Sequence, residues 1–459
     1  MDTREKVNST VTFETEPPAG PIGSAGILFI CMGTVLGGGI ISLLPTAITQ
    51  GGGIAGLLFP LCAIIGTFFL APFIIACRCV RLGGGGVSLV GGLLRGKYTF
   101  ITGCYSFIVC FAILSVATYG ASLGNYIKAV FPNTNVMLVA AIATTAFMGL
   151  HMMGVDLFAK VQSIMMPILL VGLAIFAVAG LTHINQPIFD TSLPSFMPNG
   201  LAGVFAAWMV MMNCCTSAQG TIYQGRNATD AKRDIPRGIL ITQIFIVILY
   251  AICGIVAVGV VPPGELNGTL VSVAYAIFPS WFATIWTLVV PGLLVLTTYN
   301  GLYSQFTMQL FQLGMDGWLP SVFQKKNKRG APWICVLTVF AIAIIPTLLD
   351  WNINTILSQV NVTMFVGDLI VGILLFKLPT VFAKSWEMRM NWLPKGVYYL
   401  ICAISLVIKA AMAITGFLNL TTMTIIINVC VFVAIFIWVG IVDKKNGGHI
   451  RISCWGEEN

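Results

Sequence analysis

Long runs of apolar residues with almost no charge restrict what this chain can fold into. Of its 459 residues, 57% are hydrophobic and only 9% are charged, and the mean hydropathy is +0.93. A soluble domain carries roughly 25% charged residues, so the composition excludes a large surface in contact with water. The runs are long enough for helices that cross a bilayer, and longer than the strands of a membrane barrel.

Twelve such runs predict an all-α membrane protein with twelve transmembrane helices. Because the loops between them are short, we expect one membrane domain over 21–441, with tails over 1–20 and 442–459. The predicted helices are 22–48, 54–79, 100–129, 134–153, 157–181, 199–224, 238–261, 280–312, 332–350, 355–377, 394–418 and 420–441.

The basic residues predict how these helices are oriented. Lys and Arg gather in both tails and in every second loop, whereas the loops of the other face carry only Lys128. Cytoplasmic loops hold an excess of Lys and Arg. Both termini are therefore predicted to be cytoplasmic, in a multi-pass protein of the cell (plasma) membrane. The bilayer accounts for the basic residues, and no nucleic-acid partner is expected.

Two of the apolar segments contain interruptions. The first is GTVLGGG at 33–39, and the second is NCCTSAQG at 213–220. Glycine favours unwinding, and polar groups are costly in hydrocarbon. Paired broken helices are the best sequence pointer to the binding site of a secondary transporter. The chain then divides into five-helix repeats over 22–181 and 199–377, of inverted topology because five is odd, and extra helices over 394–441.

Each interruption has a second interpretation. Gly33 and Gly37 form a GxxxG pair, which is typical of closely packed membrane helices. Three consecutive glycines exceed what packing requires, which favours a break. The polar residues at 213–220 can line a cavity, or they can hydrogen-bond to neighbouring helices. A break would direct free N–H groups and the positive end of a half-helix towards a carboxylate.

Four stretches resemble motifs of the amino acid–polyamine–organocation superfamily. They occur in that family's order over about 300 residues. The resemblance implies an amino acid permease with a LeuT-like fold, in which a 5+5 inverted repeat has broken first and sixth helices and two helices are added. The four stretches are GTVLGGGIISLLP (33–45), RLGGGGVSLVGGLLRG (81–96), AKRDIPRGI (231–239) and TMQLFQLGMDGWLPSVFQKKNKRGAPW (307–333).

The resemblance also implies which residues bind the substrate. In such permeases, backbone groups at the first break hold the substrate carboxylate, and carbonyls at the second break hold its amino group. Side chains at the second break contribute to specificity. The implied substrate-binding residues are Thr34, Val35, Gly37, Gly38, Gly39, Asn213, Cys214, Cys215, Thr216, Ser217 and Gln219.

Transport could be coupled to sodium. The candidate ligands are carbonyls near Gly33 and Leu36 and the hydroxyls of Thr297 and Thr298. The alternative is that these threonines hydrogen-bond back to their own helix. The lysine that replaces sodium in some members of the superfamily is not found, because Leu169 occupies that position.

A buried ionisable residue could instead couple transport to protons. Asp368 and Lys409 lie deep in predicted helices, where a charge costs about 2.5–3.5 kcal/mol on insertion scales. Asp368 is a candidate for coupling or for substrate recognition, and the alternative is a structural ion pair between Asp368 and Lys409.

These observations predict a secondary active transporter that moves an amino acid, or a related small amine or acid, by alternating access. The alternative is a permease-fold membrane sensor that does not transport. No Walker motif, nucleophile elbow or metal-ligand spacing is present, so we expect no enzyme, no metal and no cofactor beyond Na⁺ or H⁺. The expected partners are a small-molecule amino acid and the bilayer, with no obligate protein partner. The scarcity of acidic residues near the interruptions favours a neutral substrate.

Overall fold

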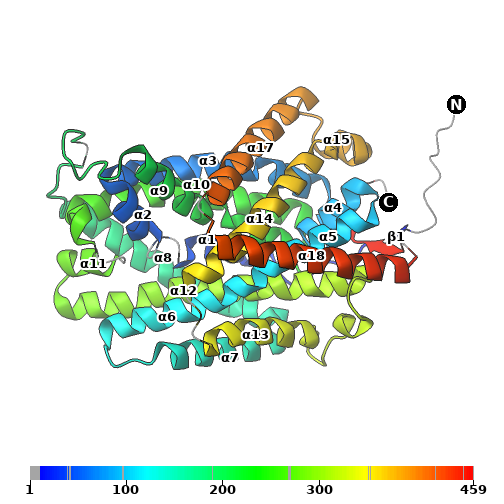
Figure 1. Ribbon diagram of the computed structural model, residues 1–459, viewed down its shortest axis with the longest axis horizontal. Helices are drawn as coiled ribbons and strands as arrows, with labels where there is room; N and C mark the ends of the chain where they lie inside the picture. Colours follow the sequence, from blue (N-terminus) through cyan, green and yellow to red (C-terminus); the bar gives the residue numbers. More distant parts are fainter. Residues whose placement is uncertain are drawn as a thin grey trace.

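The computed structural model describes residues 11–38, 40, 43–95, 98–188, 190–266, 270–349, 351, 353–418, 420–447 and 449–457. Most of this part of the chain is helical, and the long helices form a single bundle (Figure 1). The α-helices are α1 (Ser24–Gly38), α2 (Leu44–Gly51), α3 (Ala55–Cys79), α4 (Gly86–Leu94), α5 (Thr99–Cys110), α6 (Val116–Val130), α7 (Val136–Met152), α8 (Val155–Thr182), α9 (Gly200–Thr216), α10 (Ala231–Val260), α11 (Val271–Ile277), α12 (Ser280–Asp316), α13 (Trp333–Leu348), α14 (Ile353–Leu375), α15 (Leu378–Val381), α16 (Ala383–Arg389), α17 (Lys395–Leu418) and α18 (Thr422–Lys445).

Shorter elements connect and cap this bundle. The 3₁₀ helices are η2 (Gly52–Ile54), η3 (Phe111–Ser115), η4 (Ser217–Gln224), η5 (Pro263–Glu265) and η6 (Ser321–Gln324). The strands are β1 (Val11–Phe13), β2 (Arg81–Leu82), β3 (Ile450–Ile452) and β4 (Cys454–Trp455). β1 pairs with β3 in parallel, and β2 pairs with β4 antiparallel. Both chain tails therefore meet at one end of the bundle, which we call the tail end; the opposite end is the mouth end.

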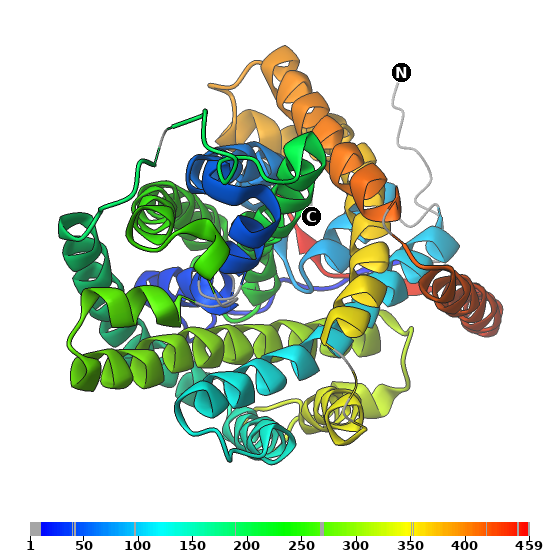
Figure 2. The same cartoon turned by 60° about the vertical axis from the view of Figure 1, so that its left-hand side comes forward.

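The helices confirm an all-α membrane protein. Nine helical runs among the described residues are long and apolar enough to cross a bilayer, and three further apolar helices are shorter. Each of these twelve helical stretches overlaps one predicted segment over most of its length, although the run Leu44–Cys79 begins inside the predicted segment 22–48. The exact number of membrane crossings and the inverted repeat stay predictions. α17 and α18 lie on the outside of the bundle, where α17 packs on α3 and α14 and α18 packs on α5 and α14 (Figures 1 and 2).

One predicted boundary was wrong. The stretch AKRDIPRGI, expected in a loop before a helix at 238, forms the first turns of α10 from Ala231. Asp234 is buried there and accepts a 2.6 Å hydrogen bond from the Ser24 hydroxyl at the start of α1. Pro236 lacks an N–H, so it forgoes only one helical hydrogen bond close to the start of the helix. The polar stretch is helical because its buried carboxyl group has a partner.

α3 and α10 approach each other through glycines. A Cβ atom on Gly254 would lie 2.7 Å from the carbonyl oxygen of Gly56, and one on Gly56 would lie 3.1 Å from that of Gly254. Small residues permit such backbone contact, which supplies packing energy between helices in a membrane. α3 also packs on α9 and α1 packs on α10, so these helices form a connected group.

Replacing Gly254 with leucine should therefore destabilise the fold, because the new side chain meets backbone atoms that cannot move aside. We expect a cost of about 1–3 kcal/mol or more, measured as a lower melting temperature of the purified protein in detergent. Gly149→Leu is the matched control, since nothing lies within 4 Å of a Cβ atom there. Equal melting temperatures for the two variants would contradict this packing.

Candidate functional site

The first interruption lies at Gly37. α1 loses helical geometry at this residue (φ −34°, ψ −147°), and α2 begins at Leu44. A break of this kind deprives the preceding carbonyls of their usual partners four residues later. Side chains from other helices donate to carbonyls beside the break: Thr298 Oγ1 of α12 donates to the Gly33 carbonyl at 2.7 Å, and the Tyr250 hydroxyl of α10 donates to the Val35 carbonyl at 3.1 Å.

Both Gly33 and Gly37 are closely packed, and the break lies at the second of them. A Cβ atom on Gly37 would lie 1.5 Å from Thr298 Oγ1, and one on Gly33 would lie 1.8 Å from Gln162 Nε2. A side chain at Gly37 would meet Thr298 and push α1 away from α12, whereas one at Gly33 would displace the end of the Gln162 side chain. The GxxxG pair thus packs α1 against its neighbours, and its second glycine is also where the helix is interrupted. Both interpretations of the sequence hold.

The second interruption is a change of helix type. α9 continues as a regular helix through Asn213 and Cys214 to Thr216, and η4 follows from Ser217 as a 3₁₀ helix of eight residues. The expectation of a broken stretch over 213–220 was therefore wrong: the chain stays helical there and only changes helix type at Ser217. Runs of 3₁₀ helix longer than three or four residues are uncommon and often mark a functional hinge or strain.

Hydrogen bonds within the helix explain why these polar residues do not unwind it. Thr216 Oγ1 donates to the Met212 carbonyl at 3.0 Å, and Ser217 Oγ donates to the Asn213 carbonyl at 2.7 Å. Such back-bonding satisfies a hydroxyl in an apolar setting. At the junction with η4, the Cys215 carbonyl accepts a 2.9 Å hydrogen bond from Gln243 Nε2 of α10.

A cavity of about 500 Å³ lies between the two interruptions. Gly33, Val35, Leu36, Cys215 and Thr297 are buried but do not line it. Gly38 is the last residue of α1, and Gly39 lies outside the described residues. The predicted residues that line it are Thr34, Gly37, Asn213, Cys214, Thr216, Ser217, Gln219, Thr298 and Asp368.

Asp368 faces this cavity from α14. Its Oδ1 accepts a 3.1 Å hydrogen bond from Gln219 Nε2, which joins α14 to η4. Among the described lining residues, Asp368 is the sole charged side chain. The carboxyl group therefore lies where it can meet a bound solute.

Lys409 does not pair with Asp368, so the structural ion pair is not formed. Lys409 is 1% exposed, and its Nζ donates to the Phe69 carbonyl at 2.9 Å and to Ser405 Oγ at 2.5 Å. The ammonium also lies 3.8 Å from the ring centroid of Phe69 and 5.3 Å from that of Phe73. An aromatic face attracts a desolvated cation. Among the described residues, these groups take the place of a carboxylate partner.

The two threonines of α12 differ in their hydrogen bonds. Thr297 Oγ1 donates to Leu294 in its own helix at 3.0 Å, as the alternative interpretation predicted, whereas Thr298 donates across to α1. Thr298 Oγ1 and the Gly33 oxygen thus already satisfy each other. Both could bind one sodium ion only if the hydroxyl hydrogen were turned away.

Sequence reasoning missed several lining residues, most of which come from other helices. Polar residues in apolar segments, such as Ser115, Gln305 and Asn361, were the available signal. Nothing in the sequence distinguished the apolar and aromatic ones from ordinary core residues. The further lining residues include Leu43, Thr46, Gln50, Tyr105, Val109, Ser115, Tyr119, Tyr223, Leu302, Gln305, Phe306, Asn361, Met364, Phe365 and Met412.

The cavity extends towards the mouth end. Gln50 in the last turn of α2 and Leu357 and Ser358 near the start of α14 line it and are partly exposed. On the tail side, Gln224 at the end of η4 donates to Ser304 of α12 at 3.1 Å, and both side chains are buried. The described conformation is therefore packed shut towards the tails.

Comparison with known proteins assigns the family. A family model described as "Amino acid permease" matches residues 22–392. The chain belongs to the amino acid permease family. The predicted resemblance to the amino acid–polyamine–organocation superfamily is thereby confirmed, and membership supports a multi-pass membrane protein.

Two curated relatives are named as a transporter and a permease. The permease is 27% identical over 251 residues to the "Uncharacterized transporter lpg1691" of Legionella pneumophila, which covers 51% of this chain and 52% of that protein. It is 24% identical over 192 residues to the "Branched-chain amino acid permease BcaP" of Lactococcus lactis, which covers 40% and 41% respectively. The aligned part thus spans about half the length of these relatives or less.

Thr298→Val should destabilise the permease more than Thr297→Val. Both changes replace a hydroxyl with a methyl group of similar size, but only the first leaves the Gly33 carbonyl without its side-chain donor. A buried hydrogen bond contributes about 0.5–1.5 kcal/mol, so losing this link between α12 and α1 should lower the melting temperature of Thr298→Val measurably. If Thr297→Val lowered it equally, the hydrogen bond between α12 and α1 would have no special role.

Proposed function

We propose that this permease is a secondary active transporter that carries an amino acid through the cavity by alternating access. The observation that supports this most is the meeting of both helix interruptions at one cavity in a member of the amino acid permease family. Interrupted helices expose backbone groups that a small polar solute needs. A cavity that reaches one end of the bundle and is packed shut towards the other fits one state of such a cycle.

The lining favours a neutral amino acid. Apolar and aromatic residues such as Val109, Phe306 and Met364 suit an uncharged side chain, and no Lys or Arg is found among the described lining residues. The substrate ammonium would lie near Asp368, and its carboxylate would lie near the interruption at Gly37. The relative BcaP, a branched-chain amino acid permease by name, is compatible with this substrate class.

Movement would take place between two groups of helices. The packing of α3 on α10 and α9, and of α1 on α10, supports a moving group of α1 to α3, α9, η4 and α10. The irregular geometry at Gly37 and the change of helix type at Ser217 supply places where it can bend. We propose twelve membrane crossings with a 5+5 inverted repeat, and a cytoplasmic tail end, because basic loops gather there.

Asp368 would couple transport to protons. Its carboxyl group lies at the cavity with one described hydrogen bond, from Gln219. A carboxyl group in this position can exchange a proton with water in the cavity and alter its attraction for the substrate ammonium. Sodium coupling is less well supported, because Thr298 and the Gly33 carbonyl satisfy each other and Thr297 bonds within its helix.

Purified permease in liposomes should accumulate labelled neutral amino acids when an inward proton gradient is imposed. Asp368→Asn should reduce this gradient-driven uptake at least tenfold, since the amide cannot exchange a proton. Ligand-induced thermal stabilisation, which follows from mass action, should persist for at least one amino acid in the variant. Asp190→Asn, at an exposed loop carboxylate, is the matched control and should transport normally.

Three outcomes would contradict parts of this proposal. Uptake that follows a sodium gradient and ignores pH would reject proton coupling. Specific thermal stabilisation without flux under any gradient would favour a sensor that does not transport. Absence of both binding and flux for all amino acids would reject the substrate class.

A further inference from the structure

The C-terminal residues 450–457, which we call the clasp, join the tail end of the bundle. β3 lies beside β1 with Val11, Thr12 and Phe13 in register with Ile450, Arg451 and Ile452. β4 pairs with β2, which follows α3. The clasp is thus held between the N-terminal tail and the stretch that follows α3 (Figure 1).

An ion pair beside the clasp connects the N-terminal tail to the chain after η4. Arg226 donates to both carboxylate oxygens of Glu14, at 3.1 and 2.5 Å. The two side chains are only 11% and 19% exposed. Burial raises the pKa of Glu14, but the hydrogen bonds from Arg226 and Ser453 and the charge of Arg226 outweigh it, so the pKa lies below its usual range. Glu14 is therefore ionised at neutral pH.

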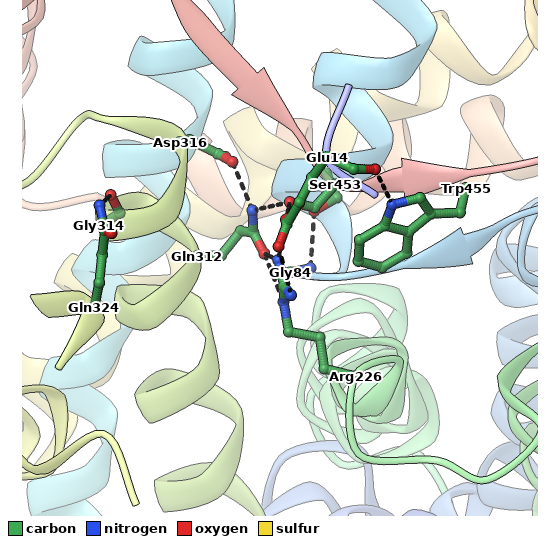
Figure 3. A network of polar contacts seen from close by, with 10 residues as sticks. Glu14, Gly84, Arg226, Gln312, Gly314, Asp316, Gln324, Ser453 and Trp455 are labelled. Carbon is green, nitrogen blue, oxygen red and sulfur yellow. Dashed lines mark hydrogen bonds and ion pairs between the residues drawn. The ribbon is translucent and has the colours of Figure 1, made fainter. Parts of the chain in front are cut away.

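Ser453 of the clasp lies at the centre of this network (Figure 3). Its hydroxyl donates to Glu14 Oε2 at 2.5 Å and accepts from Arg226 Nη2 at 3.0 Å and from Gln312 Nε2 of α12 at 2.6 Å. Its carbonyl accepts from the Gly83 N–H at 2.8 Å. One clasp residue thus links the N-terminal tail, the chain after η4, α12 and the chain after β2.

Trp455 covers the same ion pair. Its side chain is 1% exposed, and its Nε1 donates to the Glu14 carbonyl at 2.5 Å. The guanidinium groups of Arg226 and Arg81 lie 5.2 and 5.7 Å from its ring centroid, within the range of a favourable cation–π contact. The indole thereby excludes water from a charged pair, which strengthens the attraction between the charges.

Glu457 contacts one helix of the proposed moving group and one helix outside it. Its carboxylate pairs with Lys232 in the first turn of α10 at 3.4 Å and with Arg389 at the end of α16 at 2.9 Å. α10 belongs to the proposed moving group, whereas α12 and α16 do not. Relative movement that opened the tail end would separate these partners. The cavity reaches the mouth end in the same conformation.

We propose that the clasp is a gating element: it holds the tail end shut while the cavity faces the mouth end, and it must release for the substrate to leave at the tail end. This proposal rests on the proposed function, because a gate matters only if solute passes. A purely structural cap would also stabilise the fold, but it would stay in place throughout transport. The two roles differ in what happens when the clasp is weakened or fixed.

Weakening the clasp should expose the cavity to the tail side. The reporter is a cysteine in the cavity, introduced as Ser217→Cys, and a membrane-impermeant thiol reagent is applied from the tail side of oriented liposomes. Adding Ser453→Ala and Trp455→Ala to this protein should make the reagent react with the cysteine at least fivefold faster. The labelling rate of the same proteins without Ser217→Cys is subtracted, which removes the contribution of the native cysteines. Trp392→Ala, at a tryptophan that is 65% exposed, is the matched control and should change nothing.

Fixing the clasp should stop transport without preventing binding. Thr12 and Arg451 are exposed register partners on neighbouring strands, and strand spacing of about 4.7–4.9 Å suits a disulfide. Oxidised Thr12→Cys/Arg451→Cys permease should lose at least nine-tenths of its flux, keep its ligand-induced thermal stabilisation, and recover flux after reduction. Each single-cysteine variant should be unaffected by oxidation.

The outcomes separate this proposal from the proposed function. Normal flux with the disulfide fully formed would overturn the gating role, as would unchanged thiol labelling in a folded clasp variant. If the double alanine variant did not fold, the disulfide experiment would still decide the question. Failure of the parent protein to bind or move amino acids would reject the proposed function instead, whereas labelling from the tail side does not require flux.

Discussion

The contact between Gly37 of α1 and Thr298 of α12 is the constraint on which the candidate site depends. No side chain fits between these residues, so α1 lies directly against α12 at the point where its helix is interrupted. The hydroxyl of Thr298 donates a hydrogen bond to the Gly33 carbonyl beside the break. A buried carbonyl without a partner is costly, and so the neighbouring helix makes the interruption tolerable.

At the second interruption the buried polar groups also have hydrogen-bond partners, but these are supplied in another way. The hydroxyls of Thr216 and Ser217 bond within their own segment, and Gln243 of α10 satisfies the Cys215 carbonyl where the helix type changes. The polar residues therefore need no open loop. They still place Gln219 against Asp368 at the cavity. At both interruptions the adjacent helices supply the donors that water would supply in a soluble protein.

Much of the architecture could be predicted because apolar length and the distribution of charge reflect the bilayer directly. The interruption at Gly37 could be predicted from its glycines. The helical state of 213–216 could not, because it depends on which carbonyl each hydroxyl reaches. The early start of α10 was missed because Asp234 is satisfied by Ser24, which is distant in sequence. The partners of Lys409 were missed for a similar reason, since a carbonyl and an aromatic ring leave no pattern of charge.

Lining residues such as Tyr105 and Asn361 were hidden for a geometric reason. Nearly uniform hydrophobicity in a membrane helix does not reveal which of its faces is turned towards a cavity. A polar residue in such a helix indicates a buried face, but an aromatic residue is equally suited to lipid, to the core and to a solute. The family resemblance located the two interruptions, whereas the remaining wall depended on how the other helices are rotated about their axes.

The glycine seam between α3 and α10 has a consequence for how the bundle can deform. Where Gly56 and Gly254 meet, main-chain carbonyls lie against the opposite main chain with no compressible side chains between them. Sliding α3 along α10 would force backbone atoms of one helix past those of the other. Tilting both helices together leaves the contact between Gly56 and Gly254 unchanged. α3 and α10 therefore move as one rigid unit. Any change in the tilt of this unit must be accommodated by bending in other parts of the bundle.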